Sequence, residues 1–144
     1  MPLFQFSSTI NETYYNVLEK LFYFNSGQFR YYDRIVEVVE AYGQPKIECR
    51  DGMLTMTVES LPECLNLFAS HSNSVVGVMI YFKESETIMN ILHIAVDTAF
   101  SAKGEQSVIS AMMEEMQRIA HQDTGITHLK ISYTRRLFKI VKDE

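Results

Sequence analysis

The sequence predicts a single α/β domain of the α+β kind, with helices flanking a mixed, mostly antiparallel sheet. The chain has 144 residues, 47% of them hydrophobic, which suits one domain with a real core. Apolar residues recur at helical spacing in some segments and alternate or run continuously in others. No repeat, low-complexity segment or interdomain linker divides the chain. The expected order is two helices, a hairpin, a short helix, a second hairpin, a long helix and a last strand.

The N-terminal segment is expected to form two helices. Thr9 and Glu12 have the spacing of a capping box, so the first helix should begin near Thr9 and end at 25–27. The second should begin near Asp33 and end at Gly43, because glycine accepts the left-handed geometry of a helix end. The first helix carries aromatic residues on more than one face, which favours a covered helix or a homodimer contact: Tyr14, Tyr15, Phe22, Tyr23 and Phe24.

A first hairpin is expected over residues 47–58, where apolar and polar residues alternate. Asp51 and Gly52 tolerate the positive φ angles of a two-residue turn between its strands. In that register Cys49 lies opposite Leu54 on one face of the hairpin.

A short helix and a second hairpin should follow. Ser60 and Glu63 have capping-box spacing, and the helix they begin would turn three residues inward: Leu61, Leu65 and Phe68. The apolar run 75–82 is typical of a strand covered on both faces, and 88–96 is predicted as the returning strand. This hairpin should be the centre of the sheet.

The last long helix should begin near Glu105 and end before Gly125. Its apolar positions form one stripe: Val108, Ile109, Met112, Met113, Met116, Ile119 and Ala120. Residues 129–133 alternate as a last strand. Five of the 13 basic residues fall in the last 15 positions, and a solvated tail is favoured for them over a phosphate-binding or partner-binding role: Lys130, Arg135, Arg136, Lys139 and Lys142.

Composition excludes several classes of function. The net charge of −5 argues against nucleic-acid binding, and no apolar run approaches the ~20 residues of a membrane helix. The first residues lack the pattern of a signal peptide, so a cytoplasmic location is expected. Cys49 and Cys64 lack metal-ligand spacing and are expected to be reduced and buried. No metal site is expected either from the three histidines near predicted element ends: His71, His121 and His128.

The candidate site is the loop 97–106, which joins the strand ending at Val96 to the last long helix. Such a loop can aim backbone N–H groups at an anion, and the helix N-terminus adds partial positive charge. The phosphates of a nucleotide or a coenzyme suit this arrangement. An ordinary strand-to-helix connection, with Gly104 supplying flexibility, explains the same loop equally well.

This segment resembles the GNAT acetyltransferase superfamily. The signature of that family is a strand ending in Val, then x-Pro-x-Tyr-Arg-x-x-Gly-x-Gly, then a helix. Without a gap, Val96 matches the strand end, Phe100 the aromatic position and Gly104 the first glycine. The order of elements over about 74–134 is similar as well. The resemblance implies one GNAT-like domain over residues 1–144.

Three positions depart from the family pattern. Ser101 stands where the family has Arg or Gln, and Gln106 stands in place of the second glycine. Asn90 stands where a general-base carboxylate is often found, and an amide cannot take a proton from an amine. These departures favour a non-catalytic interaction or regulatory domain that has lost the cofactor. Gly104 and the gap-free spacing favour an enzyme or a coenzyme-binding relative.

For an active member, the resemblance implies an N-acyltransferase that uses acetyl-coenzyme A (acetyl-CoA) and a small-molecule or peptide amine. The coenzyme would lie between the strand 129–133 and three residues of the preceding strand: Ile94, Ala95 and Val96. Its pyrophosphate would be held by the loop residues Ser101, Ala102, Lys103, Gly104, Glu105 and Gln106. Whether the space between the two strands is open or filled by side chains should discriminate the two functions.

The resemblance also implies catalytic roles. Tyr133 would protonate the departing thiolate, and Glu84 or His93 would act as the base. A backbone N–H near Ala95 or Val96 would polarise the thioester oxygen. His93 alternates with Ile91 and Ala95 and is expected to share one face of the strand with them, so a hydrogen-bonded core or surface histidine is the favoured alternative for it.

Overall fold

The computed structural model describes residues 3–23, 32–97, 99, 107–133 and 136–140. Over these residues the strands are β1 (Gln5–Ser7), β2 (Ile10–Asn11), β3 (Pro45–Arg50), β4 (Met53–Val58), β5 (Leu65–His71), β6 (Ser74–Lys83), β7 (Ile88–Val96), β8 (His128–Ile131) and β9 (Arg136–Lys139). The helices are η1 (Glu12–Tyr14), a 3-10 turn, and α1 (Tyr15–Tyr23), α2 (Tyr32–Tyr42) and α3 (Val108–Gln122). No helix of the described part is long and apolar enough to cross a membrane.

The strands form two sheets. The larger has the order β1-β5-β6-β7-β8-β9 and the smaller the order β2-β4-β3. Every pairing is antiparallel except that of β7 with β8, which α3 connects in parallel. The predicted mixed, mostly antiparallel sheet flanked by helices is therefore confirmed.

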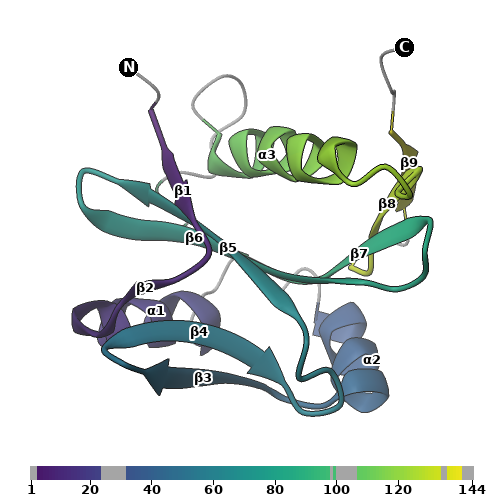
Figure 1. Cartoon of the computed structure of the whole chain (residues 1–144). Helices are drawn as coiled ribbons and strands as arrows, with labels where there is room; N and C mark the ends of the chain where they lie inside the picture. Colours follow the sequence, from purple (N-terminus) through teal and green to yellow (C-terminus); the bar gives the residue numbers. More distant parts are fainter. Residues whose placement is uncertain (1–2, 24–31, 98, 100–106, 134–135, 141–144) are drawn as a thin grey trace.

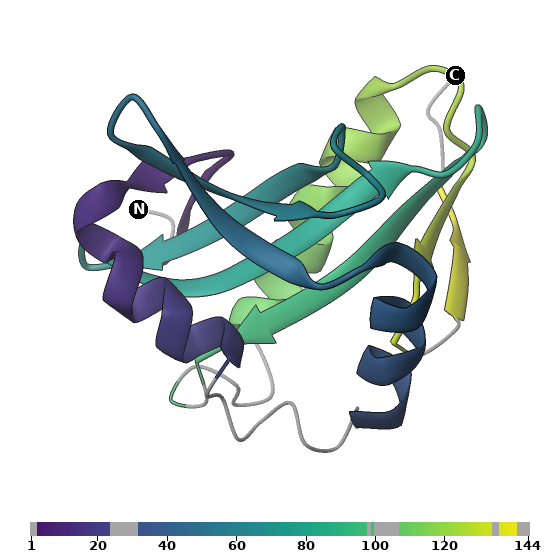
Figure 2. The same cartoon turned by 90° about the horizontal axis from the view of Figure 1, so that it is seen from below.

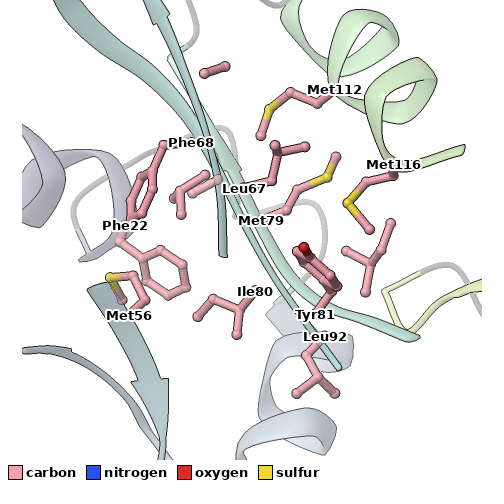
Figure 3. Packing of buried hydrophobic residues seen from close by; sticks show 14 of the residues in the cluster. Phe22, Met56, Leu67, Phe68, Met79, Ile80, Tyr81, Leu92, Met112 and Met116 are labelled. Carbon is pink, nitrogen blue, oxygen red and sulfur yellow. The ribbon is translucent and has the colours of Figure 1, made fainter. Parts of the chain in front are cut away.

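The elements form layers around the larger sheet. Figure 1 shows α3 on one face, with α1, α2 and the smaller sheet on the other. Figure 2, seen from below, shows α1 and α2 at opposite ends of that second layer. Alternate residues of the central strands supply the core on each face. Figure 3 shows Met79 and Tyr81 on the side of Met112 and Met116, and Ile80 on the side of Phe22.

The prediction that the first helix begins near Thr9 is wrong. Ile10 and Asn11 pair with β4, so this segment is extended before it turns. The cap is Asn11, whose side chain accepts a hydrogen bond from the Thr13 N–H at 2.9 Å. The expected end at 25–27 lies outside the described residues.

The second helix and the first hairpin agree with expectation. α2 ends at Tyr42, and Gly43 follows it at φ +101°. Asp51 and Gly52 have φ angles of 54° and 79°, and Cys49 lies opposite Leu54. The expectation of two buried thiols is wrong for Cys49, which is exposed at this edge strand, whereas Cys64 is half-buried and both are free thiols.

The short helix predicted from Ser60 is wrong, because this part of the chain makes a turn and then β5. Ser60 does not begin a helix, and its hydroxyl donates to the Tyr42 carbonyl at 2.5 Å. β5 lies between β1 and β6, so consecutive residues such as Leu67 and Phe68 are both buried. A run that is buried on both sides has no period that separates a strand from a helix. Leu65, expected to point inward, is 53% exposed.

The second hairpin is confirmed as the centre of the sheet, since β6 and β7 occupy its middle positions. α3 begins at Val108, and the Ser107 hydroxyl caps it by accepting from the Ser110 N–H at 3.3 Å. The expected start at Glu105 lies outside the described residues. The apolar stripe of α3 that faces the sheet is narrower than expected, because Ile109 is 37% exposed. Its fully buried members are Val108, Met112, Met116 and Ala120.

The C-terminal segment differs from the expected solvated tail. β8 ends at Ile131, and β9 returns along it as an edge strand in which Lys139 lies opposite His128. The buried Ile140 ends this return, and its N–H donates to the Thr127 carbonyl at 2.7 Å. A four-residue strand between basic residues has too short a pattern to be predicted from its own sequence.

Candidate functional site

The parallel strands β7 and β8 stay together for only part of their length. They pair from Ile88–His128 to Ile91–Ile131, and the Ser132 N–H adds a last bond to the Ile91 carbonyl at 3.0 Å. β7 then continues to Val96, paired in the described structure with β6 alone. We call this divergence of β7 from β8, over residues 93–96 of β7, the fork. Main-chain groups on one side of β7 are thereby released from the sheet.

A β-bulge lies at the start of the fork. Ile80 of β6 faces His93, whereas Tyr81 faces Ile91, so Leu92 is an extra residue in β7. His93 therefore lies on the face of Ile80, and Ile91 lies on the opposite face. The expectation that His93 shares a face with Ile91 is wrong for this reason.

His93 and Tyr133 meet at the fork. The Tyr133 hydroxyl lies 2.8 Å from His93 Nδ1, and the two rings are 5.7 Å apart at 82°. Phe22 of α1 packs edge-on against the same imidazole, with ring centroids 5.7 Å apart. His93 is fully buried and Tyr133 only 4% exposed. The phenol also takes a hydrogen bond from the main chain of Ile94. The fork is therefore filled at His93.

Burial fixes the protonation of both side chains. It lowers the pKa of His93 from 6.5 to about 4, so the imidazole is neutral at pH 7. Burial raises the pKa of Tyr133, although the bond from Ile94 acts in the opposite direction, so the phenol keeps its proton. Because the Tyr133 oxygen accepts from Ile94, its own proton is free to point at His93 Nδ1. The imidazole proton is then on Nε2, which is buried and has no partner among the described residues.

A second polar group ties the strands together before the fork. Glu84 Oε1 accepts from Asn90 Nδ2 at 3.0 Å and from Lys130 Nζ at 3.1 Å. The Ser132 hydroxyl donates to Asn90 Oδ1 at 2.8 Å. Asn90 is 1% exposed, so these bonds satisfy a side chain that would be costly to bury alone. Glu84 is thus engaged with Asn90 and Lys130, while Tyr133 is brought to His93.

The coenzyme-binding residues expected from the sequence fall into two groups. Within β7, Ala95 is buried, and Ile94 and Val96 are half-buried. The loop residues Ser101, Ala102, Lys103, Gly104, Glu105 and Gln106 lie outside the described residues. Asp97 begins the loop, and its N–H donates to the Val76 carbonyl at 2.8 Å. Within the described ranges, no group of His, Cys, Asp or Glu side chains could hold a metal ion.

Sequence reasoning missed three features of this site: the bulge at Leu92, the contact of Phe22 with His93, and the bonds of Asn90. One signal was present. Asn90 and His93 are polar residues within an otherwise apolar strand, and buried polar side chains require partners. The identity of those partners could not be read from the sequence, because Tyr133 and Ser132 lie some forty residues away along the chain.

No protein-family model matches the chain, and no curated protein matches it either, so neither comparison assigns it a family.

Proposed function

We propose that the protein binds an acyl-coenzyme A at the fork, with acetyl-CoA as the simplest such thioester, and transfers the acyl group to an amine. The observation that carries the proposal is the divergence of β7 from β8 after Ile91. Beyond this point, among the described residues, β7 is paired with β6 alone, and the main chain of Ile94 already bonds a group from outside the sheet. A linear ligand with amide groups can bond such an edge as an added strand.

The end of β7 supports the same ligand. The chain leaves β7 at Val96, and α3 begins at Val108, so α3 is the element that follows the fork along the chain. Free N–H groups and the helix dipole at a helix N-terminus favour phosphate. The GNAT resemblance predicts that the residues from Ser101 to Gln106 hold the pyrophosphate. This role for the loop, like the GNAT-like assignment of the whole chain, is part of the proposal.

Bound acetyl-CoA would supply an acyl group already activated as a thioester for attack by the amine. The Ile94 N–H would donate to the acyl oxygen and stabilise the charge that develops there. Tyr133 keeps its proton at neutral pH and would give it to the sulfur as the C–S bond breaks, and the proton that the amine loses as the C–N bond forms would return to the phenolate. A pKa of about 4 makes His93 a weak base, so within this proposal it holds Tyr133 in the ligand-free protein and does not take the amine proton. The acceptor amine must arrive uncharged. Glu84 as the base stays a prediction.

Calorimetric titration with acetyl-CoA, and with coenzyme A as the control ligand, tests the proposal. Binding in the micromolar-to-millimolar range of ordinary enzyme substrates is expected. Gly104→Asp should weaken it, because the new carboxylate adds negative charge beside the phosphates. Glu59→Asp, on the far layer, is a matched control that leaves the loop unchanged. Equal affinity in Gly104→Asp would contradict the loop assignment. Absence of heat and of thermal shift at millimolar ligand would contradict coenzyme binding itself.

A second candidate is a non-catalytic interaction domain. The observation that favours it is the filled fork, in which Tyr133 takes the bonds of both Ile94 and His93. The uncharged Asn90 also occupies the position at which the resemblance predicts a carboxylate. A homodimer is a form that such a domain would take, since Tyr15 and Val17 of α1 are 43% and 38% exposed. Sedimentation of the protein with and without acetyl-CoA distinguishes a ligand-free dimer from a ligand-binding monomer.

The location of the protein belongs to the same proposal. A cytoplasmic location, as the sequence predicts, would give the fork access to acetyl-CoA and to free amines.

A further inference from the structure

We infer that Tyr133 holds the fork closed in the free protein, and that its departure uncovers a small polar subsite formed by His93 and the main chain of Ile94. The subsite would take a ligand group that both donates and accepts a hydrogen bond, such as a hydroxyl or a secondary amide. That such a group belongs to a coenzyme rests on the proposed function. The existence of the subsite does not.

The geometry places one hydroxyl on both polar groups of the fork. The Tyr133 oxygen lies 2.8 Å from His93 Nδ1 and takes the hydrogen bond of the Ile94 main chain. Tyr133 is not part of a strand, because β8 ends at Ile131, yet its side chain is 4% exposed. The phenol thus occupies the place where the next residue of a paired strand or a ligand would meet β7.

The chemistry of the two groups selects what can replace the phenol. The main chain of Ile94 offers a donor, and the neutral His93 offers an acceptor at Nδ1. A hydroxyl matches both at once. An apolar group in the same place would leave two buried polar groups unpaired, which is costly.

His93 Nε2 supplies a second observation. It is buried and has no hydrogen-bond partner among the described residues, in an imidazole that is fully buried. Buried polar atoms in native proteins are nearly always bonded to protein, water or ligand. The imidazole that holds Tyr133 through Nδ1 thus keeps unused hydrogen-bonding capacity at Nε2, so His93 is not fully satisfied in the closed arrangement.

The first experiment removes the Tyr133 side chain and offers the protein a small molecule of the same shape. In Tyr133→Ala, p-cresol should raise the melting temperature and bind about tenfold more tightly than toluene, which lacks the hydroxyl. The wild-type protein should respond to neither. Equal binding of p-cresol and toluene to Tyr133→Ala would overturn the polar subsite.

Tyr81→Ala is the matched control. Tyr81 is 6% exposed and lies on the opposite face of the sheet, and its hydroxyl has no hydrogen bond within the described structure. The cavity left there has the same size but lacks the His93–Ile94 pair. Burial and, after it, the nearby Glu115 carboxylate raise the pKa of Tyr81, and that carboxylate is bonded to Arg118. It should therefore accept p-cresol and toluene about equally. A preference for p-cresol as large as that of Tyr133→Ala would show that the phenol shape alone, and not the His93–Ile94 pair, selects the probe.

The second experiment keeps the ring and removes only its hydroxyl. In Tyr133→Phe, hydrogen exchange of the Ile94 amide should be about tenfold faster, because its bond to the phenol is lost. Unchanged protection of that amide would overturn the inference even where Tyr133→Ala does not fold.

Titration with acetyl-CoA then distinguishes the closure of the fork by Tyr133 from the proposed function. The coenzyme should bind about tenfold more tightly to Tyr133→Phe than to the wild type, since the closed state has lost its bonds. Equal affinity would contradict the closed fork and leave coenzyme binding intact. No binding to any variant, with p-cresol still selected by Tyr133→Ala, would contradict the proposed function and leave the subsite intact.

Discussion

The side chain of Asn66 hydrogen-bonds both main-chain polar groups of Met56. Asn66 Oδ1 accepts from the Met56 N–H at 2.7 Å, and Nδ2 donates to the Met56 carbonyl at 2.9 Å. Asn66 is on β5 of the larger sheet and Met56 on β4 of the smaller one. A single side-chain amide therefore takes the place of a strand neighbour and joins the two sheets in the interior, where both residues are buried.

Asn66→Ala should destabilise the protein by roughly 2–4 kcal/mol, because it leaves the buried Met56 N–H unpaired and the Met56 carbonyl with only the weak bond from the Cys64 thiol. Urea unfolding of the variant and the wild type measures the difference. Asn16→Ala, at an exposed position of α1, is the matched control and should change stability by less than about 0.5 kcal/mol. A loss in Asn66→Ala no larger than the control's would show that water satisfies Met56 instead.

Stability should fall as the pH is lowered from about 6.5 toward 4, through His93. Burial lowers its pKa from 6.5 to about 4, so the unfolded chain takes up a proton over this range while the folded protein does not. The loss amounts to about 3 kcal/mol. This loss of stability is complete below the pKa of His93 in the folded protein and absent above its pKa in the unfolded chain.

The variant His93→Gln isolates this contribution, because every other titrating group is common to both proteins. The difference in unfolding free energy between wild type and variant should shift in favour of the variant as the pH falls from 6.5 to 4. A difference that is independent of pH over this interval would mean that His93 is not buried as a neutral imidazole.

Gly77→Ala should destabilise the packing between the sheet and α3. A Cβ at this position would lie 2.7 Å from Met112 Sδ and 3.3 Å from Val108 Cγ2. Crowding of this kind costs about 1–3 kcal/mol, reduced to the extent that the methionine side chain moves. Met112→Ala makes space for the methyl group, so the two substitutions together should cost less than the sum of their separate effects. Additive effects in a double-mutant cycle would contradict the close approach.

The two cysteines should differ in their reaction with a thiol reagent. Cys49 is exposed and should react well before the half-buried Cys64. The pKa of the Cys49 thiol is raised, first by desolvation and then by the Glu12 carboxylate, which accepts its hydrogen bond at 3.5 Å. The rate should therefore rise with pH, and Glu12→Gln should move that rise to lower pH. Time-resolved labelling of Cys49→Ser and Cys64→Ser assigns each phase, and a faster Cys64 would contradict the burial pattern.

Local signals in the sequence were enough for some elements. The hairpin around Asp51 and Gly52 was predictable because the turn residues and the alternation agree on one register. The hairpin 75–96 was predictable because two apolar runs of strand length flank a short polar turn, which is typical of strands covered on both faces. Capping spacing alone was not sufficient. Thr9 precedes a short strand and Ser60 a turn, because pairing with β4 and β6 outweighs what a cap contributes.

The sequence by itself determined the class of the fold, the central hairpin and the amphipathic α3. Only the tertiary structure decided what surrounds His93 at the fork. A bulge of one residue at Leu92 chose the face on which His93 lies, and the chain beyond β8 brought Tyr133 to it from forty residues away. Periodicity records which positions are buried together within an element. It holds no information on which distant polar group will satisfy a buried one, because that choice depends on how the packed elements meet.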